Sequence, residues 1–258
     1  MVAATNSRSD LQFKDYFSQD SSAYQVYRPN YPKSLFDYLS SLVVENNLAW
    51  DCATGTGQAA VSLSNYFSNV VATDASSEQI NNAVLATNID YQVGRAEQSD
   101  FEECSVDLIT VAQSIHWFDL KAFYTEVNRV LKPNGVLAIW TYNLLKVSPE
   151  IDAIVNQIYY DELGDFWPKE RQIIENNCKD IDFPMHSINA PKIEMQANWN
   201  LEQFLGYLNT WSALKLKQKS THKNVIFDYQ PQLQKVWQDC DDKKTISWPL
   251  TLKVWQKI

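Results

Sequence analysis

The stretch Asp51-Cys52-Ala53-Thr54-Gly55-Thr56-Gly57 decides how this chain of 258 residues folds. It follows a short apolar run at residues 48–50. It precedes a segment in which apolar residues recur at helical spacing, namely Ala59, Ala60, Leu63, Tyr66 and Phe67. A strand, a glycine-containing turn and a helix in this order begin a βαβ unit. Because glycine allows a tight turn and close approach of the backbone to a ligand, the stretch predicts a ligand-binding loop.

The residues beyond this loop continue the alternation of strands and helices. Apolar runs predict strands at residues 70–73, 106–112 and 136–140, and residues 89–93 are a further predicted strand. Ser76 and Asp119 are the expected N-caps of two intervening helices. The turn Lys132-Pro133-Asn134-Gly135 ends the second of these helices, because proline cannot continue a helix. This order of elements is typical of a parallel sheet.

We therefore predict an α/β fold, with a Rossmann-like, mostly parallel seven-stranded sheet and helices on both faces. Residues 1–258 form a single domain, in which residues 45–145 are the cofactor-binding core. Residues 1–40 and about 150–240 supply a helical cap and the substrate-side elements. Within the second part we expect helical structure at 150–179 and 201–214, a strand at 192–199, and a closing strand at 246–255 that Pro249 places at an edge or bulge.

The composition argues against several classes of protein. The net charge is −9, whereas nucleic-acid binders usually carry a basic face. No apolar run is long enough to cross a bilayer and residues 1–10 are polar, so we expect a cytoplasmic protein that binds neither nucleic acid nor membrane. The cysteines and histidines are scattered and predict no metal site.

The glycine loop alone is compatible with two cofactors. Gly55-Thr56-Gly57-Gln58-Ala59-Ala60 matches the dinucleotide fingerprint, and Asp74 follows at the distance expected for a carboxylate that binds ribose. An NAD-dependent oxidoreductase is therefore one interpretation. Asp51 argues against it, because a carboxylate before the loop would repel a pyrophosphate and attract an ammonium group.

Five segments in order resemble the class I S-adenosylmethionine-dependent methyltransferases. The first is the loop from Asp51 to Gly57. It is followed by Thr73-Asp74-Ala75-Ser76, Gly94-Arg95-Ala96-Glu97, Val106-Asp107-Leu108-Ile109 and the segment Arg129 to Gly135. Ala53 replaces the first glycine of the family motif, and alanine fits if that position has ordinary backbone angles.

The resemblance implies S-adenosylmethionine as the cofactor and a set of residues that bind it. These are Asp51, Ala53, Gly55, Gly57, Asp74, Ala75, Ala96, Glu97, Gln113 and Tyr24.

A narrower resemblance involves three further segments, Tyr27-Arg28-Pro29-Asn30-Tyr31-Pro32, Gln113 to Asp119, and Thr210-Trp211-Ser212-Ala213. They are similar to the trans-aconitate methyltransferase-like branch, which includes enzymes that methylate small carboxylic acids. This resemblance implies a small-molecule methyl acceptor.

The residues expected on the acceptor side follow from their chemistry. Arg28 can pair with a carboxylate in bidentate geometry, and Trp117, Tyr142 and Trp211 are expected to line the acceptor pocket. His116 and Gln113 are the candidate catalytic residues, His116 as a general base for a hydroxyl or amine acceptor.

A carboxylate acceptor would need no base. A non-catalytic cofactor-binding module is the remaining alternative, and we expect a monomer or a homodimer.

Overall fold

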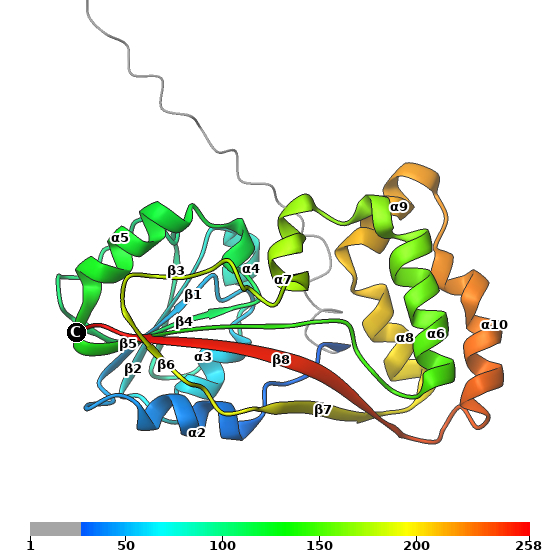
Figure 1. Ribbon diagram of the computed structural model, residues 1–258, viewed down its shortest axis with the longest axis horizontal. Coiled ribbons are helices and arrows are strands. Elements are labelled where there is room, and N and C mark those ends of the chain that lie inside the picture. Colours follow the sequence, from blue (N-terminus) through cyan, green and yellow to red (C-terminus); the bar gives the residue numbers. More distant parts are fainter. Residues whose placement is uncertain (1–26) are drawn as a thin grey trace, which may run out of the picture.

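The computed structural model describes residues 27–258, whose strands form one mixed sheet (Figure 1). In this part of the chain the sheet has eight strands in the order β3-β2-β1-β4-β5-β8-β6, with β7 paired to β8 outside that path. The strands are β1 (Leu48–Cys52), β2 (Asn69–Asp74), β3 (Ile89–Val93), β4 (Val106–Ala112), β5 (Leu131–Tyr142), β6 (His186–Ile188), β7 (Glu194–Trp199) and β8 (Lys244–Gln256). The strands β1 to β5 are parallel, which confirms the predicted α/β fold.

The prediction of seven strands was wrong by one, because the three-residue strand β6, which pairs antiparallel with β8, was not predicted. Residues 250–256 of β8 pair antiparallel with β5, and residues 244–249 pair with β7. Pro249 pairs with Glu194 of β7 and lies one residue beyond the stretch of β8 that pairs with β5. Its ring falls where β8 leaves β5, a position at which a missing N–H group is tolerated.

Helices cover both faces of the sheet, as predicted. The helix α5 (Leu120–Val130) lies on one face, and α2 (Lys33–Ser41) and α3 (Gln58–Leu63) lie on the other (Figure 1). Successive residues of β5 alternate between these faces: Leu137 packs in the cluster that contains Phe123 of α5, and Ala138 packs in the cluster that contains Phe36 of α2. This alternation is the period of a strand that is buried on both sides.

The predicted helix starts are confirmed. The side chain of Ser76 accepts a hydrogen bond from Gln79 N at the start of α4 (Ser77–Asn81). Asp119 accepts hydrogen bonds from Lys121 N and Ala122 N at the start of α5. Both helices therefore begin immediately after a loop that follows a strand, which fixes the position of those loops.

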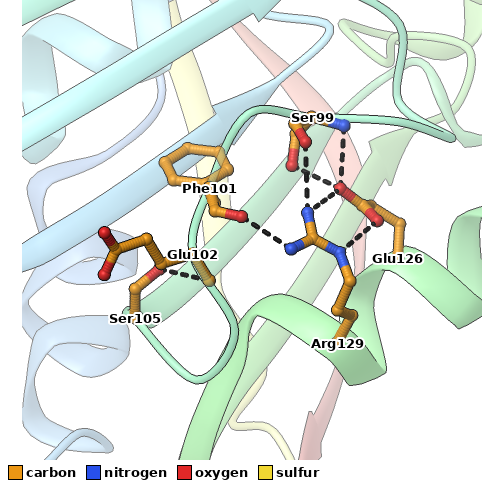
Figure 2. Close-up of polar contacts among 6 residues, drawn as sticks. All are labelled: Ser99, Phe101, Glu102, Ser105, Glu126 and Arg129. Atoms are coloured by element: carbon orange, nitrogen blue, oxygen red, sulfur yellow. Dashed lines mark hydrogen bonds and ion pairs between the residues drawn. The ribbon is translucent and has the colours of Figure 1, made fainter.

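A charged network anchors the loop that precedes β4 to α5 (Figure 2). Arg129 donates to both carboxylate oxygens of Glu126, at 2.9 and 2.7 Å, and to the Phe101 carbonyl at 2.6 Å. The N–H group of Ser99 donates to the same carboxylate at 2.7 Å. Burial opposes ionisation of Glu126, but these hydrogen bonds outweigh it and lower the pKa of the carboxyl. The network holds the end of the loop that contains Ala96 and Glu97.

The region after β5 is more broken than predicted. The helical structure predicted at 150–179 is divided into five short elements, and Pro168 separates the last two from the others because the residue before a proline is disfavoured in the helical conformation. The five elements are α6 (Pro149–Asn156), the π-helical turn η2 (Gln157–Glu162), the 3₁₀ turns η3 (Gly164–Phe166) and η4 (Lys169–Arg171), and α7 (Gln172–Glu175).

The single helix predicted at 201–214 is two helices, α8 (Leu201–Asn209) and α9 (Ser212–Thr221). They separate at Thr210, whose N–H and hydroxyl groups both bond to the Tyr207 carbonyl and tighten the last turn. With α6 and α10 (Val225–Trp237) they form a helical layer beyond the end of the sheet, around a core of its own (Figure 1). No helix in residues 27–258 combines the length and the apolar character that a membrane span requires.

Candidate active site

A cavity of about 820 Å³ opens at the carboxyl ends of β1, β2, β3 and β4. Its walls come mainly from the loops that follow these strands, as expected for an open α/β sheet. Of the residues predicted to bind the cofactor, seven line it: Ala53, Gly55, Asp74, Ala75, Ala96, Glu97 and Gln113. Tyr24 lies outside the described residues.

The glycine loop has three residues in the left-handed region. Gly55 has φ 60° and Gly57 has φ 87°, angles at which glycine carries no steric penalty. A Cβ atom on Gly57 would lie 2.2 Å from the Tyr91 hydroxyl oxygen. Both the backbone angle and the lack of space therefore exclude a side chain at this position. Ala53 has φ 55°, which corrects the expectation of ordinary backbone angles; here alanine occupies a conformation that glycine adopts more easily.

Asp51 lies beneath the loop and is fully buried. Its two carboxylate oxygens accept hydrogen bonds from the hydroxyl groups of Thr54, at 2.5 Å, and Thr110, at 2.8 Å. Burial raises the pKa of Asp51 to about 6. Neither Asp51 nor Gly57 belongs to the cavity wall: Asp51 supports the loop through Thr54, and Gly57 is the N-cap of α3.

Asp74 joins the glycine loop to the turn after β2. One carboxylate oxygen accepts from Gly55 N and the other from Ser76 N, both at 2.9 Å. Each oxygen of a carboxylate can accept more than one hydrogen bond, so the same group can also accept from ribose hydroxyls. Glu97 caps the neighbouring loop, where it accepts a hydrogen bond from Asp119 N at 3.1 Å.

A second and smaller cavity, the inner pocket, has a volume of about 70 Å³ and lies between the sheet and the helical layer. The four residues predicted on the acceptor side, Arg28, Trp117, Tyr142 and Trp211, all line it. Gln113, His116 and Trp117 line both cavities. These three residues therefore mark where the two cavities meet.

Two polar atoms at this junction are buried without a hydrogen-bond partner among the described residues, Gln113 Nε2 and His116 Nδ1. Buried polar atoms of this kind call for a ligand or a water to complete them. Gln113 has φ 61°, and its N–H group donates to the Trp140 carbonyl at 2.9 Å. Burial, with a further contribution from Arg171, lowers the pKa of His116 to about 3. The imidazole is therefore neutral at physiological pH and would hold an accepted proton poorly.

Two arginines line the inner pocket, Arg28 and Arg171, and Arg171 Nε also lies 3.9 Å from Glu175 Oε1. Arg28 donates to the Tyr142 hydroxyl at 2.9 Å and to the Thr210 carbonyl at 3.3 Å. Arg171 was not foreseen from the sequence, where Lys169-Glu170-Arg171 gives no signal beyond that of a charged surface turn. In the structure its guanidinium lies 4.4 Å from the centre of the Trp167 ring and its Nε donates to the Tyr159 hydroxyl. In the described part of the chain, two guanidinium groups and no carboxylate line this pocket.

Comparisons with known proteins agree with this geometry. A family model described as a methyltransferase domain matches residues 50–139. A protein of Dictyostelium discoideum named as a methyltransferase is 36% identical over 240 residues, which cover 91% of both chains. A Saccharomyces cerevisiae protein named as an S-adenosylmethionine-dependent methyltransferase is 25% identical over 235 residues, covering 75% of this chain and 79% of that one. A solved structure from Anaeromyxobacter dehalogenans, named as a type II methyltransferase, has 35% identity and a TM-score of 0.84, covering 89% of this chain and 98% of its own.

The similarity to the Dictyostelium protein extends over nearly the whole chain, well beyond the glycine loop that two cofactor classes share. It decides between the two cofactors that the loop left open. The chain belongs to the S-adenosylmethionine-dependent methyltransferases, and S-adenosylmethionine is its cofactor.

Proposed function

We propose that this methyltransferase acts on a small carboxylic acid, which binds in the inner pocket. The observation that carries the proposal is that Arg28 and Arg171 both line the inner pocket, whose wall includes no carboxylate from residues 27–258, in a chain whose net charge is −9. Guanidinium groups bind carboxylates in bidentate geometry, which supports an acidic acceptor over an amine. The resemblance of three segments to the trans-aconitate methyltransferase-like branch supports the same acceptor class.

The larger cavity suits the cofactor in size and in donor set. Its volume lies in the range of small-molecule sites, and Asp74 offers carboxylate oxygens for ribose hydroxyls. S-adenosylmethionine supplies a methyl group already activated by the positive charge of its sulfur. In our proposal Gln113 and His116 lie beside this methyl group, because they line both cavities.

The residues of the inner pocket then have to orient the acceptor rather than activate it. A carboxylate is ionised at neutral pH and requires no general base. We therefore propose that His116 and Gln113 are hydrogen-bonding partners of the acceptor, with Arg28 and Arg171 as its counter-charges. The earlier assignment of His116 as a base applies only to a hydroxyl or amine acceptor, and its low pKa argues against that role.

Aromatic rings connect the two arginines. Trp211 lies 6.1 Å from Tyr207 and 5.9 Å from Trp167, measured between ring centres. Arg28 lies over Tyr207, and Arg171 lies over Trp167. Such a wall excludes water and strengthens the attraction between a guanidinium and a carboxylate. It favours an acceptor with an apolar body and an acidic group at one or both ends.

The test is methyl transfer from labelled S-adenosylmethionine to matched pairs of acceptors. Each di- or tricarboxylic acid is compared with the amide of the same skeleton, so that shape is held constant while charge is removed. We expect transfer to acids and none to their amides. Transfer only to amines or phenols would overturn the proposal.

A further inference from the structure

The helix α8 carries a glycine in its interior, Gly206, although glycine weakens helices. The structure shows what its missing side chain allows. A Cβ atom on Gly206 would lie 2.4 Å from Cδ1 and 2.5 Å from Cε1 of Tyr27. These distances are far below a carbon–carbon contact, so the Tyr27 ring packs directly on the helix backbone.

The same helix also holds the residue that follows Tyr27. The carbonyl of Thr210, at the carboxyl end of α8, accepts a hydrogen bond from Arg28 Nη2 at 3.3 Å. The Tyr207 ring lies 5.4 Å from Arg28 Cζ. Gly206 and Tyr207 lie four and three positions before Thr210, so both are neighbours of Thr210 across the last turn of the helix. The partial negative charge at the end of a helix favours the guanidinium there.

The chain is held again just beyond Arg28, by the helix behind the glycine loop. Gln58 Nε2 of α3 donates to the Pro29 carbonyl at 2.8 Å and to Asn30 Oδ1 at 3.2 Å. Residues 27–30 therefore cross from the helical layer to the cofactor-binding sheet, with Arg28 between the two attachments. Since Arg28 follows Tyr27 directly, we expect a displacement of the Tyr27 backbone to move Arg28.

We infer that Gly206 is a positioning residue for the acceptor site: its missing side chain seats Tyr27, and this seat holds the Arg28 guanidinium in the inner pocket. The functional part of this inference rests on the proposed acceptor. The seating of Tyr27 and Arg28 does not.

A double-mutant cycle tests the seat without any acceptor. Gly206→Ala should lower the thermal unfolding midpoint, because the new methyl group collides with the Tyr27 ring. In a Tyr27→Ala background the same substitution should raise the midpoint, because the collision is gone and alanine is the better helix former. A lowered midpoint in both backgrounds, or an unchanged one in both, would overturn the seat.

Placement of Arg28 is read directly by its reaction with phenylglyoxal, quantified by peptide mass spectrometry. We expect Arg28 to react several-fold faster in Gly206→Ala than in the unmodified chain, with Arg129 as the internal reference. Gly164→Ala is the matched control, because a Cβ atom there meets no atom within 4 Å. Equal Arg28 reactivity in all three proteins would overturn the positioning role.

Steady-state kinetics of Gly206→Ala distinguish a positioning role from a general structural defect. With the best acceptor from the acid panel, Gly206→Ala should raise KM for the acid about tenfold, while kcat and the affinity for S-adenosylhomocysteine change less than twofold. A fall in cofactor affinity equal to the rise in KM would contradict positioning. If no acid is methylated by the unmodified protein, the proposed function fails, and the cycle and the phenylglyoxal rates still decide the seat.

Discussion

The two cavities of this protein are built in different ways. The larger cavity, which we propose holds the cofactor, draws most of its wall from the loops of consecutive βα units, between Ala53 and Asp119. The inner pocket draws its wall from positions scattered between Arg28 and Ser212. The first is a product of local sequence, and the second exists only once the helical layer has packed against the sheet. We therefore expect substitutions in one region to leave the binding function of the other largely intact.

The largest effect is expected in the cofactor region, from Asp74→Ala. The carboxylate accepts from Gly55 N and Ser76 N and, in our proposal, from ribose hydroxyls. Loss of these charge-assisted hydrogen bonds should weaken S-adenosylhomocysteine about 1,000-fold, which corresponds to roughly 4 kcal/mol. Calorimetric titration measures this, with Asp90→Ala on the neighbouring strand β3 as the control. An affinity within threefold of the unmodified protein would refute the ribose role.

The next effect concerns stability rather than binding. Arg129→Met leaves the buried carboxylate of Glu126 without its counter-charge and should cost about 2 kcal/mol of unfolding free energy. Because the pKa of Glu126 is lowered in the folded protein, this stabilisation is complete above the ordinary carboxyl pKa and is lost as the pH falls through the folded value.

Denaturant unfolding at neutral and acidic pH measures the Arg129→Met effect. Lys33→Met, which breaks an exposed pair with Asp37, should cause no measurable change. If Arg129→Met is equally harmless, the network of Figure 2 does not anchor its loop.

Arginine-to-lysine substitutions test the inner pocket while they keep its charge. Arg28→Lys and Arg171→Lys should each raise KM for the acid about tenfold, because lysine cannot make the bidentate contact. The affinity for S-adenosylhomocysteine should stay within twofold. If these variants lost cofactor affinity and kept their KM for the acid, the two arginines would act on the larger cavity and not on the inner pocket.

The smallest effect is expected from Asp51→Asn, measured as the pH dependence of thermal unfolding without cofactor. Since burial raises the pKa of Asp51 to about 6, the folded protein binds its proton more tightly than the unfolded chain does. Stability from this group therefore falls as the pH rises from 5 to 7, by about 1 kcal/mol, and asparagine removes this contribution. Parallel pH curves for the two proteins would contradict the buried, raised-pKa carboxyl.

The difference between the two cavities also explains which features could be predicted from the sequence. The bounds predicted for β3 and β4 match the structure: β4 is a buried apolar run, and in β3 apolar residues alternate with polar ones, patterns that are both visible locally. The glycine loop could be predicted because its residues are contiguous in the sequence. The angle of Ala53 was not, since a left-handed alanine is held by the surrounding fold and not by its own preference.

The residues of the inner pocket, our proposed acceptor site, were predicted only in part. Arg28, Trp117, Tyr142 and Trp211 were foreseen and line one pocket. Arg171 was missed because its turn is placed by Pro168 and by packing on Trp167, contacts that leave no periodic pattern. Gly206 was missed because a glycine within a helix has no visible purpose until Tyr27 lies against it.

The central claim is that the acceptor is already ionised and that the site supplies position and charge, not a base. The pH dependence of kcat for methyl transfer to the best carboxylic acid tests it directly. We predict a constant kcat between pH 6.5 and 9, because the acid is ionised throughout and His116, with a pKa of about 3, has no proton to lose in that range. A kcat that rises about tenfold per pH unit toward a plateau near neutrality would show that a base must be deprotonated, and would contradict this account.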